Sequence, residues 1–304
     1  MRDVQDKLRA TAKDLLASGK VELVLGFEPA SLPMRTRACF ARTADAAERL
    51  VWNEFCSQNL AAYLPRLFEK PAHIRGDWTP PKVAVVTKNC DARSIIGLVK
   101  EHQLARENVV IIGMPCQGMV DPEKAAATVD ERIAQACLEC VSPSPIGADI
   151  LIEGQSRPAA ADRFQRVKDF EALTPAQRWD AFVKEISKCT RCYACRQACP
   201  NCYCKSCFIE QSKPSWAGAG DDLADLLLFH IGRMFHQAGR CVECDACVRA
   251  CPMGIDLRLF TQKLVKDVEE LFGYVPGVSL DDLPPLCTFQ SDDSECFVTG
   301  PGEE

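Results

Sequence analysis

Cys189-Thr-Arg-Cys192-Tyr-Ala-Cys195-Arg-Gln-Ala-Cys199-Pro200 is the stretch that decides the fold of the C-terminal half of this chain. It returns 52 residues later as Cys241-Val-Glu-Cys244-Asp-Ala-Cys247-Val-Arg-Ala-Cys251-Pro252, and seven of the twelve positions are identical. Each copy spaces three cysteines at intervals of three positions and adds a fourth cysteine, followed by proline, four positions later. The repeat predicts two similar loops that hold two similar metal centres.

The spacing of the repeat is C-x2-C-x2-C-x3-C-P, which is typical of proteins with two [4Fe-4S] clusters. Three thiolates on one short loop reach three irons of a cubane, and the fourth ligand comes from the other loop. Zinc and disulfides are the alternatives, but zinc sites typically use two separated pairs of ligands. We therefore predict two crossed ligand sets: site 1, formed by Cys189, Cys192, Cys195 and Cys251, and site 2, formed by Cys241, Cys244, Cys247 and Cys199.

The composition is that of a globular protein that can bury a sizeable core. The chain has 304 residues, of which 47% are hydrophobic and 26% are charged, so we expect about two domains. Its start is a charged amphipathic helix without a signal-peptide core, and no run of about 18 apolar residues predicts a membrane span. We expect a cytoplasmic protein whose 19 cysteines stay reduced and serve mainly as metal ligands.

The formal net charge is -6. Each oxidised [4Fe-4S] cluster with four thiolates adds about -2, which brings the loaded protein to about -10. No basic stripe predicts nucleic-acid binding. The expected partners are other redox subunits of a complex or a soluble electron carrier. Neither a Ser/His/Asp set nor paired carboxylates stand out, so hydrolytic catalysis is not expected.

Residues 1–155 alternate strand and helix patterns, which favours an α/β domain with a mainly parallel sheet. Short runs rich in valine and isoleucine predict strands. The expected strands are Val21–Phe27, Val83–Thr87, Val109–Gly113 and Ile150–Glu153, and the expected helices are 45–69, 92–104 and 122–136.

The C-terminal half is expected to be helical. We predict a charged connector over 156–173, an α-helical dicluster domain over 174–272 and an extended acidic arm over 273–304, either solvated or lying on a partner. Helices flank both cysteine blocks, with Thr174 as the cap of the first. The stretch GRCVECDACVRACPMGIDL from Gly239 to Leu257 resembles the α-helical ferredoxin domains of fumarate reductase and heterodisulfide reductase iron–sulfur subunits.

A further set of cysteines lies in the N-terminal domain. Cys90 and Cys116 each follow a predicted strand, and Cys137 and Cys140 form a C-x2-C pair. Loops at the carboxyl ends of neighbouring parallel strands share one edge of a sheet, where ligands bind. These four residues therefore predict a third [4Fe-4S] site, which we call site 3. The alternatives are buried thiols that act as small hydrophobes, or a zinc site.

The loop from Lys88 to Ser94 joins a strand to a helix, and Asp91 is placed to cap that helix. Backbone amides at a helix start bind anions, and Lys88 and Arg93 would add positive charge. A flavin or nucleotide phosphate is one hypothesis for this loop, and a solvated charged loop is the other. Neither a glycine-rich Rossmann fingerprint nor a P-loop is present.

The run VAVVTKNCDARSIIGLVKEHQLARENVVIIGMPCQGMVD from Val83 to Asp121 resembles the coenzyme F-420 hydrogenase/dehydrogenase beta-subunit family, as does CLECVSPSPIGADILIEG from Cys137. The resemblance covers roughly residues 20–155. It implies an iron–sulfur protein, with FAD in several members, within hydrogenase, formate dehydrogenase or heterodisulfide-reductase-type complexes. The cysteines of site 3 match the family's cysteine-bearing stretches.

Several polar residues have no assigned role in this scheme. Cys202, Cys204 and Cys207 either bind another metal, replace Cys90 or Cys116 in site 3, or stay free thiols. The spacing Cys195-x3-Cys199-x2-Cys202 matches that of radical-SAM enzymes, by coincidence in our interpretation. Residues that could tune a cluster are His230, His236 and Arg240, although helix packing is the favoured role of the histidines. Cys287 and Cys296 are expected to be plain thiols.

The sequence thus predicts an iron–sulfur electron-transfer subunit that relays single electrons between a flavin or partner dehydrogenase and another redox subunit. The alternative is a flavin-dependent oxidoreductase subunit that itself reduces or oxidises a deazaflavin or nicotinamide-type carrier. A redox-sensing or scaffold role is a third interpretation, but two complete cluster motifs exceed what sensing requires.

Overall fold

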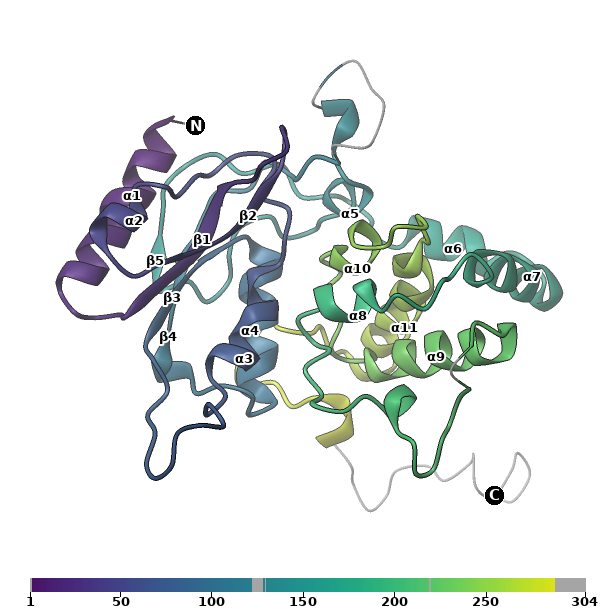
Figure 1. Cartoon of the computed structure of the whole chain (residues 1–304). Helices are drawn as coiled ribbons and strands as arrows, with labels where there is room; N and C mark the ends of the chain where they lie inside the picture. The colour runs from purple at the N-terminus through teal and green to yellow at the C-terminus, as the bar shows by residue number, and fades with distance from the viewer. Residues whose placement is uncertain (1, 122–127, 129, 219, 288–304) are drawn as a thin grey trace.

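The structure, a computed structural model, describes residues 2–121, 128, 130–218 and 220–287. An α/β unit comes first in the chain and lies beside a helical unit (Figure 1). The sheet order is β2-β1-β3-β4-β5. Strands β1, β3, β4 and β5 are parallel and β2 pairs antiparallel with β1, which confirms the mainly parallel sheet. The strands are β1 (Leu23–Pro29), β2 (Thr36–Ala41), β3 (Val83–Thr87), β4 (Val109–Gly113) and β5 (Ile150–Leu151).

The central strands follow the apolar runs of the sequence. Every residue of β3 is buried, as expected for a parallel strand that is covered on both faces. The bounds of β3 and β4 match the prediction, whereas β1 begins two residues later than expected. Strand β2 was not predicted because its run TRACFA is short and begins with two polar residues, yet it pairs with six residues of β1.

Helices cover both faces of the sheet. Helices α1 (Arg2–Ala17) and α2 (Ala44–Ala47) lie on the outer face, and α3 (Leu64–Leu67) and α4 (Asn89–Lys100) lie between the sheet and the helical unit (Figure 1). Helix α4 corresponds to the helix predicted over 92–104, but it begins three residues earlier, at Asn89. Its carboxylate at Asp91 accepts a hydrogen bond from the backbone N of Lys88 at 2.9 Å, as expected for a capping residue.

The predicted helix over 45–69 is wrong. Only α2, α3 and a 3-10 turn at Leu60–Tyr63 are helical in this segment. The amide oxygens of Asn53 and Asn59 accept the backbone N–H groups of Phe55 and Ala61 at 2.9 and 3.1 Å, so side chains replace helical partners here. In the predicted helix over 122–136, residues 122–127 and 129 lie outside the described residues, and the rest forms a 3-10 turn (Asp130–Arg132) and the start of α5 (Gln135–Leu138).

The C-terminal half is helical, as predicted. Its helices are α6 (Gln165–Glu171), α7 (Pro175–Ile186), α8 (Ala194–Ala198), α9 (Leu223–His236), α10 (Ala246–Arg249) and α11 (Leu257–Phe272). Its 3-10 turns are Phe208–Glu210 and Pro285–Cys287, and a further 3-10 turn, Arg106–Asn108, lies directly before β4 in the α/β unit. Thr174 forms a capping box with Gln177 at the start of α7, and Gly273 ends α11 at φ +61°. None of the described helices is both long and apolar enough to cross a membrane.

A buried polar network joins the two units. Arg258 on α11 forms ion pairs with Glu139, which follows α5, and with Glu243 in the second cysteine block. The side-chain amide of Gln262 donates to Glu243 Oε1 at 2.8 Å and to the carbonyl of Arg163 at 2.7 Å. Because removing one partner would leave a buried charge unpaired, this network fixes the second cysteine block against the α/β unit.

The segment after α11 packs on the chain itself. Arg93 donates from Nε and Nη2 to the carbonyl of Pro276 at 2.9 and 2.8 Å, and Lys100 donates to the Tyr274 hydroxyl at 3.1 Å. The start of the expected arm therefore lies on α4 rather than on a partner or in solvent. Residues 288–304 of that arm lie outside the described residues.

A glycine makes this anchor possible. Gly277 has φ +72°, and a Cβ at this position would lie 2.2 Å from the carbonyl oxygen of Arg93. We expect Gly277→Ala to lower the free energy of unfolding by about 2 kcal/mol or more, because backbone must move at a strained position. Gly76→Ala is the matched control, since Gly76 has φ +89° but open space around it. Thermal unfolding of the two variants would measure the difference, and equal losses of Tm would show that no close packing exists at Gly277.

Candidate iron-sulfur sites

The two cysteine blocks share an uncommon backbone. Arg191 and Tyr193 in the first block have φ of 52° and 58°, and Glu243 and Asp245 at the same positions of the second have φ of 60° and 63°. Left-handed conformations cost non-glycine residues about 1 kcal/mol or more each and concentrate at ligand-binding loops. The turn directs the N–H of Arg191 to Cys189 Sγ at 3.3 Å, and that of Glu243 to Cys241 Sγ at 3.4 Å. Both loops are thus shaped to direct amides at sulfur.

The structure brings together the cysteines predicted for site 1. Burial raises the pKa of the Cys189 thiol, and the neighbouring thiols of Cys251 and Cys192 raise it further. Burial likewise raises the pKa of Cys195 to about 11, with Cys251 again among the nearby thiols. Cys251 belongs to the second block, yet it lies beside the cysteines of the first block.

Site 2 shows the reciprocal arrangement. Burial raises the pKa of Cys247 to about 12, and the thiols of Cys199 and Cys244 contribute to the shift. Cys199, from the first block, also lies near Cys244, and Cys241 lies near both Cys244 and Cys247. Helices α8 and α10, which follow the two loops, pack against each other and hold the crossed pairs in place.

The four cysteines of site 3 line one cavity of about 70 Å³ at the carboxyl edge of the sheet. Burial raises the pKa of Cys116 to about 11, and Cys137 and Cys140 are close enough to contribute. Cys90 in the first turn of α4 lies near Cys116 as well. The structure therefore brings the four cysteines predicted for site 3 to one cavity.

Polar side chains position the loops of site 3. The side-chain amide of Asn89 donates to the carbonyl of Ser142 and accepts the N–H of Ile146 at 2.9 Å, which fixes the loop after the C-x2-C pair. The indole of Trp52 donates to the carbonyl of Pro115 at 3.0 Å, next to Cys116. These contacts join segments far apart in the sequence.

Sites 2 and 3 are neighbours across the junction between the units. The thiol of Cys244 is among the charges that raise the pKa of Cys90, after burial and Asp91. Asn59 lies beside the Cys244 thiol and donates to Ser94 Oγ at 3.0 Å, and Ser94 donates to the carbonyl of Cys90 at 2.9 Å. Since site 1 adjoins site 2 through Cys195 and Cys247, the three sites form a row in the order 1, 2, 3.

The residues present fit iron–sulfur clusters. Burial keeps the pKa of the ligand thiols high, so a bound cation is needed to hold them as thiolates. No three Cys, His, Asp or Glu side chains converge on a single metal ion in the described part of the chain. A [4Fe-4S] cubane instead binds four thiolates that are spaced around it, with one thiolate on each iron. Nε of Arg233, a buried donor near the thiols of sites 1 and 2, lacks a partner among the described residues.

Lys88 and Arg93 do not form an anion site. The Lys88 ammonium is buried and donates to the carbonyls of Cys56 and Gln58 at 2.9 and 2.8 Å, and it pairs with Asp91 at 2.8 Å. Its three protons are therefore used. Arg93 binds the carbonyl of Pro276, as described above. The hypothesis that these two residues bind a flavin phosphate is therefore wrong, because groups of the chain itself already accept their hydrogen bonds.

The surplus cysteines lie near site 2 rather than site 3. The side chain of Gln237 lies between two sulfurs, with Oε1 at 3.6 Å from Cys199 Sγ and Nε2 at 3.5 Å from Cys202 Sγ. Cys207 lies beside Arg196, and Cys204 is exposed. Of the alternatives left open for these cysteines, replacement of Cys90 or Cys116 in site 3 is not favoured for Cys202, which lies beside Cys199 and Gln237.

The residues expected to tune clusters differ in their environments. Arg240 forms an ion pair with Glu101 at 2.6 Å, so its charge is largely neutralised. His236 is exposed and packs edge-on against Phe208. His230 is buried, and burial together with the Arg233 cation lowers its pKa to about 4, which keeps it neutral. The exposed thiol of Cys287 has no cysteine partner among the described residues, and Cys296 lies outside them.

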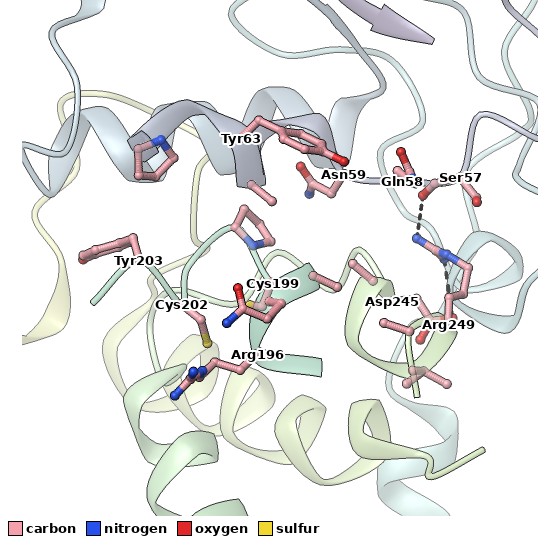
Figure 2. A pocket seen from close by; sticks show the side chains of 18 of the residues that line it. Ser57, Gln58, Asn59, Tyr63, Arg196, Cys199, Cys202, Tyr203, Asp245 and Arg249 are labelled. Carbon is pink, nitrogen blue, oxygen red and sulfur yellow. Dashed lines mark hydrogen bonds and ion pairs between the residues drawn. The ribbon is translucent and has the colours of Figure 1, made fainter. Parts of the chain in front are cut away.

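A large cleft of about 1240 Å³ separates the two units beside site 2. Tyr63 and Asn59 lie on one wall, and Cys199, Cys202 and Tyr203 lie on the other (Figure 2). The sequence did not indicate this cleft, because its walls come from segments more than 100 residues apart that carry no shared motif.

Comparisons with known proteins agree with this arrangement. The family model for the 4Fe-4S dicluster domain matches residues 185–255. The F420-dependent formate dehydrogenase subunit beta of Methanocaldococcus jannaschii is 32% identical over 126 residues, which cover 41% of this chain and 32% of the relative. The F420-dependent formate dehydrogenase 1 subunit beta of Methanococcus maripaludis is 23% identical over 296 residues, covering 67% of this chain and 75% of the relative.

The match to the first relative spans about a third of that protein's length. The dicluster model includes both cysteine blocks and the surplus cysteines between them. The chain is therefore similar to the beta subunits of these F420-dependent formate dehydrogenases, and its residues 185–255 match the 4Fe-4S dicluster domain.

Proposed function

We propose that this chain is an iron–sulfur electron-transfer subunit of a multisubunit oxidoreductase complex and holds three [4Fe-4S] clusters in a row. The observation that carries the proposal is the neighbouring position of three four-cysteine sets, two in the helical unit and one in the α/β unit. When bound, such clusters supply one-electron carriers. The row gives the chain two ends, one at site 1 and the other at site 3.

The residues around the sites hold and shield the clusters. Site 1 would use Cys189, Cys192, Cys195 and Cys251, site 2 would use Cys241, Cys244, Cys247 and Cys199, and site 3 would use Cys90, Cys116, Cys137 and Cys140. The amides of Arg191 and Glu243 donate to ligand sulfurs, which stabilises negative charge there. Arg249 donates to the carbonyls of Ser57 and Cys244, both at 2.8 Å, and so ties site 2 to the α/β unit.

The partners are proposed from the similarities. The two relatives are named as beta subunits of F420-dependent formate dehydrogenases. We therefore propose that this chain assembles with a dehydrogenase subunit of formate dehydrogenase, hydrogenase or heterodisulfide-reductase type, and relays electrons between it and a further redox subunit or carrier.

The cleft favours a second candidate, in which the chain also binds a flavin. Its walls offer the aromatic rings of Tyr63 and Tyr203 and the cation of Arg66, beside Cys199 of site 2 (Figure 2). A flavin with its phosphates needs an aromatic surface and positive charge of this kind. In this candidate the chain would itself reduce or oxidise a deazaflavin or nicotinamide-type carrier.

Coulometric titration of the anaerobically purified chain distinguishes the two candidates. Three clusters without flavin should take up about three electrons per chain, one for each [4Fe-4S] centre. A bound flavin would add about two electrons and would give flavin fluorescence in the supernatant after acid precipitation. An uptake of about two electrons without flavin would contradict the three-cluster proposal and leave only the dicluster domain.

A further inference from the structure

An arginine lies inside the helical unit between the cysteine blocks. Arg233 on α9 is 4% exposed, and its Nη2 donates to the carbonyl of Cys195 at 3.3 Å. Its Nε has no hydrogen-bond partner among the described residues. The guanidinium is therefore a buried cation with an unused donor.

No carboxylate forms an ion pair with Arg233 in the part of the chain that the structure describes. Its charged neighbours are thiols: Cys195 of site 1, Cys199 and Cys247 of site 2, and Cys202. The sulfurs of both sites thus surround one cation.

Two other buried arginines have acidic partners, whereas the buried Arg93 donates to the carbonyl of Pro276. Arg258 pairs with Glu139 and Glu243, and Arg163 pairs with Glu243 at 3.4 Å. An unpaired buried charge is strongly destabilising, so a position like that of Arg233 calls for an anion. Two thiolate-ligated clusters, each with a net charge of about -2 when oxidised, would supply it.

We propose that Arg233 is the shared counter-cation of sites 1 and 2 and raises the reduction potentials of both clusters. The inference rests on the proposed clusters and adds a residue that no sequence motif marks. Reduction adds one negative charge to a cluster, and a nearby cation in a low-dielectric interior stabilises the reduced form more than the oxidised form. Arg233 acts through the clusters and is therefore a positioning residue.

The test is a redox titration of the anaerobically purified chain, monitored by EPR, in wild type and Arg233→Met. The variant should lower the equilibrium constant for reduction of sites 1 and 2 at least about tenfold, which is a shift of about 59 mV to more negative potential for a one-electron couple. Site 3 serves as the internal reference and should not move. Arg233→Lys should keep most of the wild-type potential, because it keeps the charge.

Arg240→Met is the matched control. It removes an arginine next to Cys241 whose charge is already paired with Glu101, so its effect should be less than about threefold. Wild-type potentials in Arg233→Met, with full iron content, would overturn the inference and leave the proposed function intact. An absence of cluster signals in the wild type would instead overturn the proposed function.

If Arg233→Met loses its clusters, iron content is measured in place of the reduction potentials. Arg233→Lys should then restore iron, and the neutral Arg233→Gln should not, because the charge is what the clusters require. Equal iron loss in the lysine and glutamine variants would contradict the inference, as would full iron with unchanged potentials in Arg233→Gln.

Discussion

Replacing Cys90 with serine is expected to remove one whole cluster, or about four irons per chain, while both dicluster centres remain. Cys90 lies in the first turn of α4 and lines one cavity with Cys116, Cys137 and Cys140. Because a cubane that loses one of four thiolates becomes labile, a single substitution should empty site 3. Iron and acid-labile sulfide analysis, with protein quantified by amino-acid analysis, would measure the loss.

Cys39→Ala is the control for this prediction. Cys39 is buried in β2 of the same domain, and the charged groups near its thiol are Glu28 and Arg49 rather than other cysteines. It should keep the full iron content. If Cys90→Ser and Cys39→Ala contained equal iron, the four cysteines would be ordinary core thiols and site 3 would not exist.

Pairs of cysteine substitutions are expected to reveal the crossed ligands of sites 1 and 2. Cys192→Ser and Cys251→Ser should each remove about four irons, and the double variant should also lose only about four, since both residues serve one cluster. The pair Cys244→Ser and Cys251→Ser should lose about eight irons, because these residues serve different clusters although both lie in the second block. Iron content of the purified variants measures both outcomes.

The reverse pattern would refute the crossed assignment. If each block bound its own cluster, the Cys244/Cys251 pair would lose about four irons and the Cys192/Cys251 pair about eight. Size-exclusion elution at the wild-type volume should accompany each measurement, so that loss of iron is separated from loss of the fold. The two assignments predict opposite results for the same two double variants, so the iron content distinguishes between them.

Much of the site could be predicted because cysteine spacing is a local property. The two blocks determine their own loop conformation, and the structure repeats the same left-handed residues in both. Strands β3 and β4 were predicted to the residue because parallel strands buried on both faces are uninterrupted apolar runs. Placing Cys90 and Cys116 together followed from the shared carboxyl edge of those strands.

Other features depend on contacts that the sequence does not show. The segment after α2 carries buried apolar residues such as Leu50, Trp52 and Leu60 at spacings that suggest a helix. Its asparagines instead bind nearby backbone amides, and the chain takes an irregular path across the sheet. The link from Asn59 through Ser94 to Cys90 joins residues 35 positions apart, and only the fold brings them together.

The roles of charged residues were the hardest to predict. Arg240 stands next to a cluster ligand in the sequence, yet Glu101 pairs with it in the structure. Phosphate binding was one hypothesis for Arg93, but the carbonyl of Pro276 accepts its hydrogen bonds. Arg233 has no special place in the sequence beyond being a cation within an apolar helix. The effect of a charged side chain depends on the groups around it, and the tertiary fold determines which groups those are.

We claim that one chain holds three clusters, and the iron and acid-labile sulfide content of the anaerobically purified wild-type chain measures their number. Three [4Fe-4S] centres predict about twelve irons and about twelve sulfides per chain. A content of about eight of each, in protein whose two dicluster centres are fully occupied, would contradict the claim.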